Sequence, residues 1–452
     1  MYGFAFMNTS RFRTVAVLAA TAALCGCAAI DPYNVITRRI EAVSPVQPGA
    51  ALTPEERERA FNFVWSTVNE RYYDPKMNGA DWKAAAQRFH PLALQAGDDE
   101  AFWDMLDRMT GELRDAHTRV ESPKRAAQRR NFESVTLGFA FRLFGEALVV
   151  TSVSAESDAW WAGVRPGMSI LQIGGEPALA AYQRLLAEVR NDSTDRARHL
   201  RAVRKLTAGE LDTTAVLTFQ RADGSTFSAT LARKRIASPP SENHRVLPSG
   251  FGYLRFSAWH QPLQGEVIEA IRSLRATPGM VIDLRGNPGG SALMVRNVAS
   301  QFFTGKRTFG RALTRTGKPV SMFFEAFELI KLTQEFDGAA DAYTGPVVVL
   351  VNAASGSGSE LFAAILQSLG RAKVVGEPSC GCLLAFLGFA KVPGGGELAY
   401  SEVGFEMADG RRIEGVGVIP DVSVPLAVAD LQLSRDRTLE EAQALLRTLK
   451  PP

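Results

Sequence analysis

The chain has 452 residues, which predicts about three domains at roughly 150 residues per domain. Its 51 Lys and Arg residues nearly balance its 48 Asp and Glu residues, so the formal net charge is only +3. This balance argues against a nucleic-acid-binding protein, which would normally present a strongly basic face. Hydrophobic residues make up 46% and charged residues 22%, which excludes disordered, collagenous and multi-span membrane classes for most of the chain.

The first of two Cys-x-Cys pairs ends a leader. Two arginines precede an apolar run at residues 15–24, which is too short to span a bilayer but typical of a signal-peptide core. The run ends in Leu-Cys-Gly-Cys27, which resembles the bacterial lipobox, where the last cysteine is lipidated after cleavage. We therefore expect residues 1–26 to be a lipoprotein signal peptide and Cys27 to be the lipidation site. An ordinary signal peptide cut near Ala29 is the alternative.

Residues 27–52 contain several prolines and no clear periodicity, so we expect the lipidated Cys27 and a tether there. Several acyl chains on one cysteine anchor a protein stably. The expected location is the bacterial cell envelope, lipid-anchored on the periplasmic face. Because Ala28 rather than Asp follows the cysteine, the outer membrane is favoured.

Helical signals begin at Thr53-Pro54-Glu55-Glu56, which supplies an N-cap, a proline at the first helical position and a glutamate three residues after the cap. Apolar residues from 61 to 68 follow at i, i+3, i+4 and i+7. Further helices are expected around 82–89 and 99–113. The sequence therefore predicts a helical N-terminal domain over residues 53–130.

Residues 135–235 show short apolar runs separated by Gly, Pro and Asp, including a hairpin around residues 222–224, and predict a β-rich domain. The Leu137-Gly138-Phe139 loop and the Ala-Gly-x-x-Pro-Gly turn at 162–167 resemble a PDZ domain. In such domains the loop binds a peptide carboxylate through backbone N–H groups, and the peptide adds a strand to the sheet. The resemblance thus implies peptide binding at Leu137, Gly138 and Phe139. A generic β-rich spacer is the alternative.

Residues 245–429 alternate strands and helices, which predicts an α/β core with parallel strands. Residues 430–449 are expected to form a C-terminal helix within the last segment, 430–452. The strands of the core are expected at 252–256, 280–284, 346–351 and 373–375, and its helices at 263–276, 291–303 and 359–370.

The apolar strand at 346–351 runs into Ser355-Gly-Ser-Gly-Ser-Glu360 and then into a helix. A serine at a helix N-terminus lies among free N–H groups where the dipole favours negative charge. Ser357 is therefore a candidate nucleophile, and the N–H of Gly358 is a candidate oxyanion donor. The same pattern also describes a simple capping box of Ser357 and Glu360.

A second glycine-rich turn, Asp-Leu-Arg-Gly-Asn-Pro-Gly-Gly at 283–290, ends another buried strand. Loops at the carboxyl ends of strands gather at one edge of an open α/β sheet. The N–H groups of this turn are therefore candidates for the other half of an oxyanion hole.

Together these motifs resemble the tail-specific, or C-terminal-processing, serine proteases. The resemblance covers residues 55–425 and implies a ClpP/crotonase-like protease core, a helical N-terminal segment and a PDZ domain. It implies that Ser357 is the nucleophile and that Gly358 and Gly289 form the oxyanion hole. The matching motifs, in the family's order, are those at 283–290, 355–360, 370–378 and 415–421.

One departure determines the mechanism that the resemblance implies. Many members pair the serine with a lysine in Gly-Glu-Pro-x-x-Gly-Lys, but here Cys382 occupies the lysine position. A second branch, seen in the tricorn protease core, takes a histidine from Glu-Leu-x-x-x-His and a glutamate just before Gly-x-x-Pro-Asp. These motifs match His117 and Glu414, so His117 is the implied general base and Glu414 its orienting partner. Ala116 stands where that branch has a polar residue.

Two points stay open. His260 follows the strand at 252–256 and is a competing base, and a site without any histidine base is a third option. Cys380 and Cys382 either form a short-loop disulfide in an oxidising compartment or line the site as thiols. A soft-metal site there would lack further cysteine ligands.

The expected function is an envelope serine endopeptidase that cleaves peptides or unfolded C-terminal protein segments through an acyl-enzyme on Ser357. Its partners are protein or peptide substrates rather than nucleic acid, and it requires no metal or organic cofactor. The alternative is a catalytically degenerate PDZ scaffold or a ligand-binding lipoprotein, because the same core fold serves ligand carriage in interphotoreceptor retinoid-binding protein. Retention of Ser357, His117 and Glu414 argues against that alternative. An α/β-hydrolase esterase lacks its Gly-x-Ser-x-Gly elbow.

Overall fold

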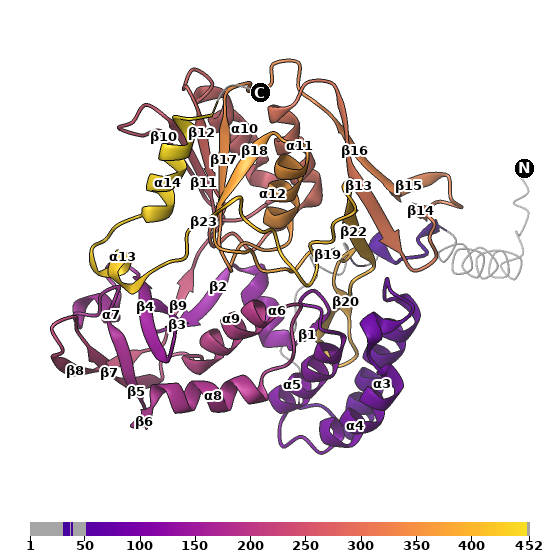
Figure 1. Cartoon of the computed structure of the whole chain (residues 1–452). Coiled ribbons are helices and arrows are strands. Elements are labelled where there is room, and N and C mark those ends of the chain that lie inside the picture. The colour runs from indigo at the N-terminus through magenta and orange to yellow at the C-terminus, as the bar shows by residue number, and fades with distance from the viewer. Residues whose placement is uncertain (1–29, 37, 39–50, 450–452) are drawn as a thin grey trace, which may run out of the picture.

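The computed structural model describes residues 30–36, 38 and 51–449 (Figure 1). The expected signal peptide, Cys27 and most of the expected tether lie outside these residues. Within the described ranges, no helix is both long enough and apolar enough to span a bilayer.

Four α-helices and two short 3-10 helices form the first part of the described chain from residue 51 to residue 130. The first starts as predicted, because the Thr53 hydroxyl accepts the Glu56 N–H and the Glu56 carboxylate accepts the Thr53 N–H. The second runs through Pro91 beyond its expected end at residue 89, because its apolar face stays buried over the last turn. The elements are α3 (Pro54–Arg71), η1 (Met77–Gly79), α4 (Trp82–Leu94), α5 (Asp99–Thr110), η2 (Gly111–Leu113) and α6 (Pro123–Arg130).

These helices share their hydrophobic core with the C-terminal half of the chain. Their buried side chains form one cluster with residues that include Leu398 and Tyr400. A short strand, β1 (Arg119–Glu121), pairs antiparallel with β21 (Glu397–Ala399), and β20 (Ala390–Lys391) completes this small sheet. The pairing places the residues just before β1 against the α/β core.

A curled antiparallel sheet follows, with strand order β3-β4-β5-β7-β8 and β3 at one edge. The predicted hairpin is present as β7 and β8, and helix α9 packs near the edge strand β3 (Figure 1). The strands β2 and β9 pair and bring the two ends of this part together. The elements are β2 (Glu133–Thr136), β3 (Phe139–Phe144), β4 (Ala147–Val153), α7 (Asp158–Trp161), β5 (Ser169–Ile173), β6 (Glu176–Pro177), α8 (Ala178–Glu188), α9 (Asp195–Leu206), β7 (Thr214–Gln220), β8 (Thr226–Ala232) and β9 (Lys234–Ala237).

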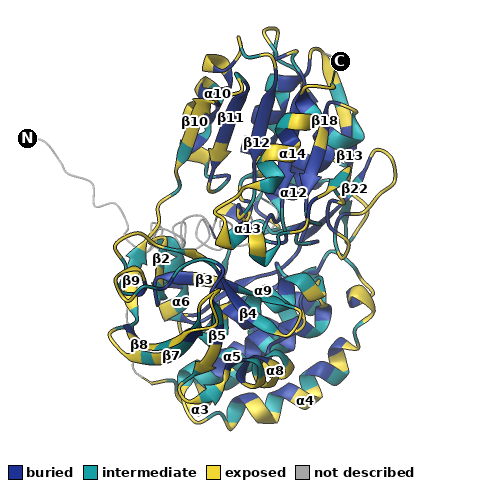
Figure 2. Cartoon of the chain, turned by 60° about the vertical axis from the view of Figure 1, so that its left-hand side comes forward, coloured by how far each residue is buried: buried dark blue, intermediate teal, exposed yellow. Residues whose placement is uncertain are grey.

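The core is a mixed α/β fold around a six-stranded sheet of order β10-β11-β12-β17-β18-β23. All neighbours from β11 onward are parallel, as predicted, and only the edge strand β10 is antiparallel. Figure 2 shows the central strands β11 and β12 buried and β10 largely exposed. The elements are β10 (Glu242–Val246), β11 (Gly252–Phe256), η3 (Gln261–Leu263), α10 (Gln264–Ser273), β12 (Met280–Asp283), α11 (Ala292–Ala299), η4 (Ser300–Phe302), β17 (Val347–Val351), α12 (Gly358–Ser368), β18 (Ala372–Gly376) and β23 (Val422–Ser423).

A second sheet of order β16-β13-β22-β19 flanks the first, and a separate hairpin of β14 and β15 projects from it (Figure 1). These strands were not predicted from the sequence, because most of them are too short to show a clear alternation of apolar and polar residues. Their bounds are β13 (Lys306–Thr314), β14 (Val320–Met322), β15 (Phe327–Ile330), β16 (Thr333–Asp337), β19 (Leu384–Ala385) and β22 (Val403–Met407).

The prediction of one continuous C-terminal helix over residues 430–449 is wrong. The structure has two helices, α13 (Val428–Gln432) and α14 (Arg437–Leu446). The chain breaks between them because Ser434 adopts a left-handed conformation with φ of 52°, and Asp436 then caps α14. Helix α14 packs its apolar side on the central sheet, so this segment belongs to the core.

The tether prediction is also wrong for the described residues between 30 and 38. Arg38 forms a buried ion pair with Glu402 at 2.9 Å, with 3% and 1% of the two side chains exposed. The Ile30 carbonyl accepts the Phe323 N–H at 2.8 Å. This stretch therefore packs on the body of the fold, because it carries the cation that the buried Glu402 needs.

Candidate active site

Ser357 occupies the sharp turn between strand β17 and helix α12. It is the N-cap of α12 and adopts φ of 51° and ψ of −113°, a conformation that residues with a Cβ rarely take. The Glu360 carboxylate accepts the Ser357 N–H at 2.9 Å, which helps to hold this conformation. Backbone strain of this kind is stored at functional sites when the surroundings enforce it.

His117 lies against this serine. Its Nε2 is 3.0 Å from the Ser357 Oγ, although 240 residues separate the two in sequence. The buried Asp115 shapes the histidine loop, since its Oδ1 accepts the His117 N–H at 2.7 Å. Its Oδ2 accepts the hydroxyl protons of Thr118 and Ser401, and the Ser401 bond ties the loop to the core.

The imidazole of His117 is poised to act as a base. Only 8% of the residue is exposed, and burial lowers the pKa of His117 to about 4, with the Asp115 charge opposing the shift. The ring is therefore neutral at pH 7. A neutral ring whose Nε2 accepts the serine hydroxyl carries its proton on Nδ1.

Glu414 does not form the expected hydrogen bond with His117. Its Oε2 accepts the Leu383 N–H at 2.6 Å. Its Oε1 and the His117 Nδ1 are both buried and, among the described residues, both lack a hydrogen-bond partner. Burial and the nearby Asp115 charge raise the pKa of Glu414 well above its usual range, and the Ser193 hydroxyl opposes the rise. A buried donor and a buried acceptor are thus left unpaired in the same region of the site.

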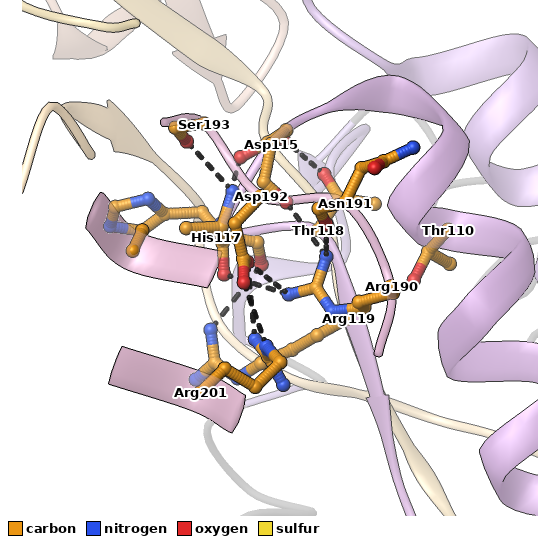
Figure 3. A network of polar contacts seen from close by, with 12 residues as sticks. Thr110, Asp115, His117, Thr118, Arg119, Arg190, Asn191, Asp192, Ser193 and Arg201 are labelled. Carbon is orange, nitrogen blue, oxygen red and sulfur yellow. Dashed lines mark hydrogen bonds and ion pairs between the residues drawn. The ribbon is translucent and has the colours of Figure 1, made fainter. Parts of the chain in front are cut away.

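A segment between α8 and α9, which was not predicted to belong to the site, supports the histidine loop (Figure 3). The Arg190 guanidinium donates to the carbonyl oxygens of Asp115 at 3.2 Å and Ala116 at 3.4 Å. The Ser193 Oγ accepts the Ala116 N–H at 2.9 Å. Arg190 is itself neutralised by buried ion pairs, including one with Asp192 at 3.3 Å. No local motif marks these residues, because their role arises only from the folded contact.

The oxyanion donors differ in part from those expected. The Gly289 N–H donates to the Asn287 Oδ1 at 3.0 Å, so Gly289 is not a free donor and its assignment is corrected. In the described structure the amides of Gly358 and Gly290 make no hydrogen bond. A Cβ placed on Gly358 would lie 3.2 Å from the Gly290 nitrogen, so the two amides are neighbours. Gly358 and Gly290 are the pair that the geometry offers.

Asn287 joins the two glycine-rich turns. Its buried side chain donates to the Phe256 carbonyl at 2.9 Å, and its own carbonyl accepts the Gly356 N–H at 3.1 Å and the Ser359 hydroxyl at 3.0 Å. The position was visible in the Asp-Leu-Arg-x-Asn-Pro-Gly-Gly motif, but its role was not. Asn287 fixes the second turn against the nucleophile turn.

Cys380 and Cys382 form a disulfide, which settles the choice between disulfide and thiols. The fully buried Glu360 carboxylate binds this loop, since it accepts the Ser379 hydroxyl and the N–H groups of Gly381 and Cys382. Burial raises the pKa of Glu360, and these hydrogen bonds oppose the rise. Glu360 thus links the disulfide loop to the nucleophile turn, in addition to its capping contact.

A pocket of about 550 Å³ opens beside Ser357 and His117. Its wall includes Leu361, Leu383, Phe386 and Phe405, and two guanidinium groups, those of Arg119 and Arg129, also line it. Arg129 stacks on the Phe389 ring at 3.6 Å. Both guanidinium groups also pair with Glu121, Arg119 at 3.1 Å and Arg129 at 2.7 Å, so the pocket combines an apolar wall with paired charges.

The remaining candidates lie elsewhere. His260 packs its ring on Phe132 at 5.3 Å rather than on Ser357, so the structure does not bring it to the nucleophile. The Gly138 N–H donates to the Thr136 hydroxyl at 3.2 Å and is not free for a carboxylate, while Leu137 and Phe139 are buried.

A second pocket of about 360 Å³ lies between β3, α9 and the core.

Two segments of the chain match known protein families. Residues 250–424 match peptidase family S41, and residues 53–111 match the tricorn protease C1 domain. A carboxyl-terminal-processing protease of Picosynechococcus sp. is 27% identical over 88% of this chain and 92% of its own length. Tricorn protease homolog 1 of Streptomyces coelicolor is 24% identical over 88% of this chain and 35% of its own length.

Solved structures share the fold. Mature CPAF superposes with a TM-score of 0.64 at 15% identity, over 87% of this chain and 97% of that one. The photosystem II D1 C-terminal processing protease gives 0.53 at 22% identity, over 87% and 98%. The S41 family domain and the carboxyl-terminal-processing relatives define a serine-type peptidase. The chain belongs to the family of C-terminal-processing serine proteases and combines an S41 peptidase domain with a tricorn C1 domain.

Proposed function

We propose that the protein is an endopeptidase of the tricorn-like branch that cleaves through an acyl-enzyme on Ser357. The observation that carries this proposal is the 3.0 Å contact between the Ser357 Oγ and the Nε2 of a neutral, buried His117. Cys382, at the expected lysine position, is in a disulfide and offers no base. His117 is therefore the general base.

The reaction follows from this geometry. The Ser357 Oγ attacks the scissile carbonyl carbon while its proton passes to the His117 Nε2, and the oxyanion accepts hydrogen bonds from the amides of Gly358 and Gly290. The imidazolium then gives the proton to the leaving nitrogen as the C–N bond breaks. A water molecule then attacks the ester carbonyl while His117 takes its proton, and Ser357 regains a proton from His117 as the acid product leaves.

Glu414 and Ser193 act behind the histidine. The imidazolium that forms during attack needs an acceptor at Nδ1, and the unpaired Oε1 of Glu414 is a buried acceptor of the required sign. Ser193 affects both sides, since its Oγ accepts the Ala116 N–H at 2.9 Å and its hydroxyl lowers the pKa of Glu414.

The substrate is a peptide or an unfolded C-terminal segment. The apolar wall of the active-site pocket fits an apolar side chain next to the scissile bond. Arg119 and Arg129 are paired with Glu121 in this structure, and a free chain end would bind there only by competing with that carboxylate for their guanidinium groups. We also assign a PDZ-like role to residues 135–235, because the edge strand β3 and helix α9 flank a pocket that could take an added peptide strand.

The proposed location is the cell envelope, with a lipid anchor on Cys27. The Leu-Cys-Gly-Cys27 motif supports the anchor. The Cys380–Cys382 disulfide supports an oxidising compartment, where such bonds persist.

A serine-reactive fluorophosphonate probe tests the proposed activity. Labelling of the intact protein that disappears in Ser357→Ala, with parallel loss of peptide hydrolysis, is the expected result. Absence of labelling and hydrolysis in the unaltered protein would contradict the proposal and favour a non-catalytic binding protein.

A further inference from the structure

The hairpin of β14 and β15 has a buried base and an exposed tip. Val320 and Met322 at its base are 1% and 5% exposed. All six residues of the tip, 323–328, are exposed, and the hairpin projects away from the second sheet (Figure 1). The core therefore fixes the direction of the hairpin while its tip makes little contact with the rest of the chain.

The tip is apolar and conformationally strained. Phe323, Phe324 and Phe327 are 45%, 72% and 53% exposed. Phe323, Phe324 and Glu325 take φ angles of 51°, 57° and 65°, where glycine or asparagine would be favoured and bulky residues are rare. A turn that only had to reverse the chain would not need two phenylalanines in this conformation. Contiguous exposed apolar groups of this kind mark a contact surface.

The tip lies beside the point where the chain would leave the membrane. The Phe323 N–H donates to the Ile30 carbonyl at 2.8 Å. Ile30 is three residues after Cys27, a separation that spans at most about 10 Å of extended chain. The Arg38–Glu402 ion pair fixes the same stretch to the body. Acyl chains on Cys27 would thus enter a bilayer next to the three phenylalanines.

We propose that the β14–β15 tip inserts Phe323, Phe324 and Phe327 into the interfacial region of the bilayer that holds the Cys27 lipid. This inference rests on the lipid anchor in the proposed function and adds a second contact that fixes the orientation of the peptidase on the membrane. Phenylalanine is among the residues that interfacial segments bury at the boundary between headgroups and acyl chains.

The charge of the hairpin makes the proposal specific. Lys318 and Lys331 lie at its base, and Glu325 and Glu328 lie at its tip and on β15, so these four residues cancel. Apolar burial rather than attraction to anionic lipid then drives the contact. Binding should therefore occur on zwitterionic lipid and persist at high salt.

The lipidated full protein in phosphatidylcholine vesicles provides the direct test. Mass spectrometry first establishes the acyl chains on Cys27, so a failed anchor is separated from a failed tip contact. Brominated lipid should quench the fluorescence added by Phe324→Trp. The matched Leu433→Trp, at a residue 74% exposed near the C-terminus, should add no quenched signal. Equal quenching, or none, in the two variants would overturn the proposal.

A second measurement removes the anchor. A mature chain with Cys27→Ser should float with phosphatidylcholine vesicles at high lipid concentration, in low and in high salt alike. Replacing Phe324 and Phe327 with serine should lower the floated fraction at least about fivefold, while Leu433→Ser should not change it. Peptide turnover should be the same in all these forms. Unchanged flotation in the phenylalanine variant would contradict the proposal. Self-association of the Cys27→Ser chain that is lost on replacing the two phenylalanines would also contradict it, since the tip would then join two copies of the protein.

Discussion

The Nε2 of His117 and the Oγ of Ser357 lie 3.0 Å apart, although 240 residues separate them along the chain. The serine sits on the turn after the central strand β17. The histidine precedes β1, whose antiparallel pairing with β21 brings the N-terminal region to the core. The site therefore exists only when the helical region is docked, because the base and the nucleophile belong to different parts of the chain.

Replacing His117 with alanine should lower kcat by roughly 10³-fold or more, since the serine then has no base. Peptide hydrolysis by the purified variant measures this loss. His260→Ala is the matched control and should retain activity, because its ring packs on Phe132. Full activity in His117→Ala, or loss confined to His260→Ala, would reverse the assignment.

The pH dependence of kcat/KM should report Glu414. Activity requires a neutral His117 and an ionised Glu414, and burial lowers the pKa of His117 to about 4 while it raises the pKa of Glu414. Activity should therefore fall as the pH falls through the raised pKa of Glu414, before His117 is protonated. The acid limb of a pH–rate profile measures this pKa.

Glu414→Gln provides the matching variant. It should lower kcat at every pH and remove the Glu414 limb from the profile. The stability of Glu414→Gln at neutral pH should equal or exceed that of the unaltered protein. A buried carboxyl with a raised pKa stabilises the fold less as the pH rises through that pKa, and glutamine cannot ionise. An acid limb unchanged in Glu414→Gln would show that another group titrates.

Ser193→Ala should lower kcat about tenfold, in the range seen when a group that orients a working histidine is lost. The hydroxyl holds the Ala116 N–H and opposes the raised pKa of Glu414, so the acid limb should also move to higher pH. Ser193→Thr should restore both properties. Asn191→Ala, an exposed neighbour on the same segment, is the control, and an equal effect of the two alanine variants would mean a merely structural role.

Gly289→Ala should lower kcat about 100-fold, comparable to the loss of one oxyanion donor. The added Cβ would lie 2.6 Å from the Gly358 nitrogen and from the Ser357 Cβ, and φ at this position is +101°. Gly286→Ala in the same turn is the matched control, since it also has positive φ but nothing within 4 Å of the new Cβ. Similar kcat values for the two variants would argue against an oxyanion hole at this turn.

The sequence motifs predicted those parts of the site whose positions depend on secondary-structure elements that follow one another along the chain. Ser357 and Gly358 were identifiable because a strand, a Ser/Gly turn and a helix follow one another along the chain. The parallel core strands were predictable for the same reason. His117 came from a family resemblance, since no local pattern reports a partner 240 residues away.

The parts that were missed depend on long-range contacts. The support of the histidine loop by Arg190 and Ser193 arises when the loop between α8 and α9 meets it. Gly290 rather than Gly289 offers an oxyanion donor, because the Gly289 N–H already donates to the Asn287 side chain. The packing of residues 30–38 depends on a buried glutamate at position 402, far along the chain.

Trapping the acyl-enzyme tests the central claim most directly. The intact protein is mixed with an activated peptide ester, quenched in acid within the first turnover and digested for mass spectrometry. An acyl adduct on Ser357 that forms in the unaltered protein and not in Ser357→Ala is the result we expect. An adduct on another residue, or hydrolysis that persists in Ser357→Ala, would contradict the assignment of Ser357 as the nucleophile.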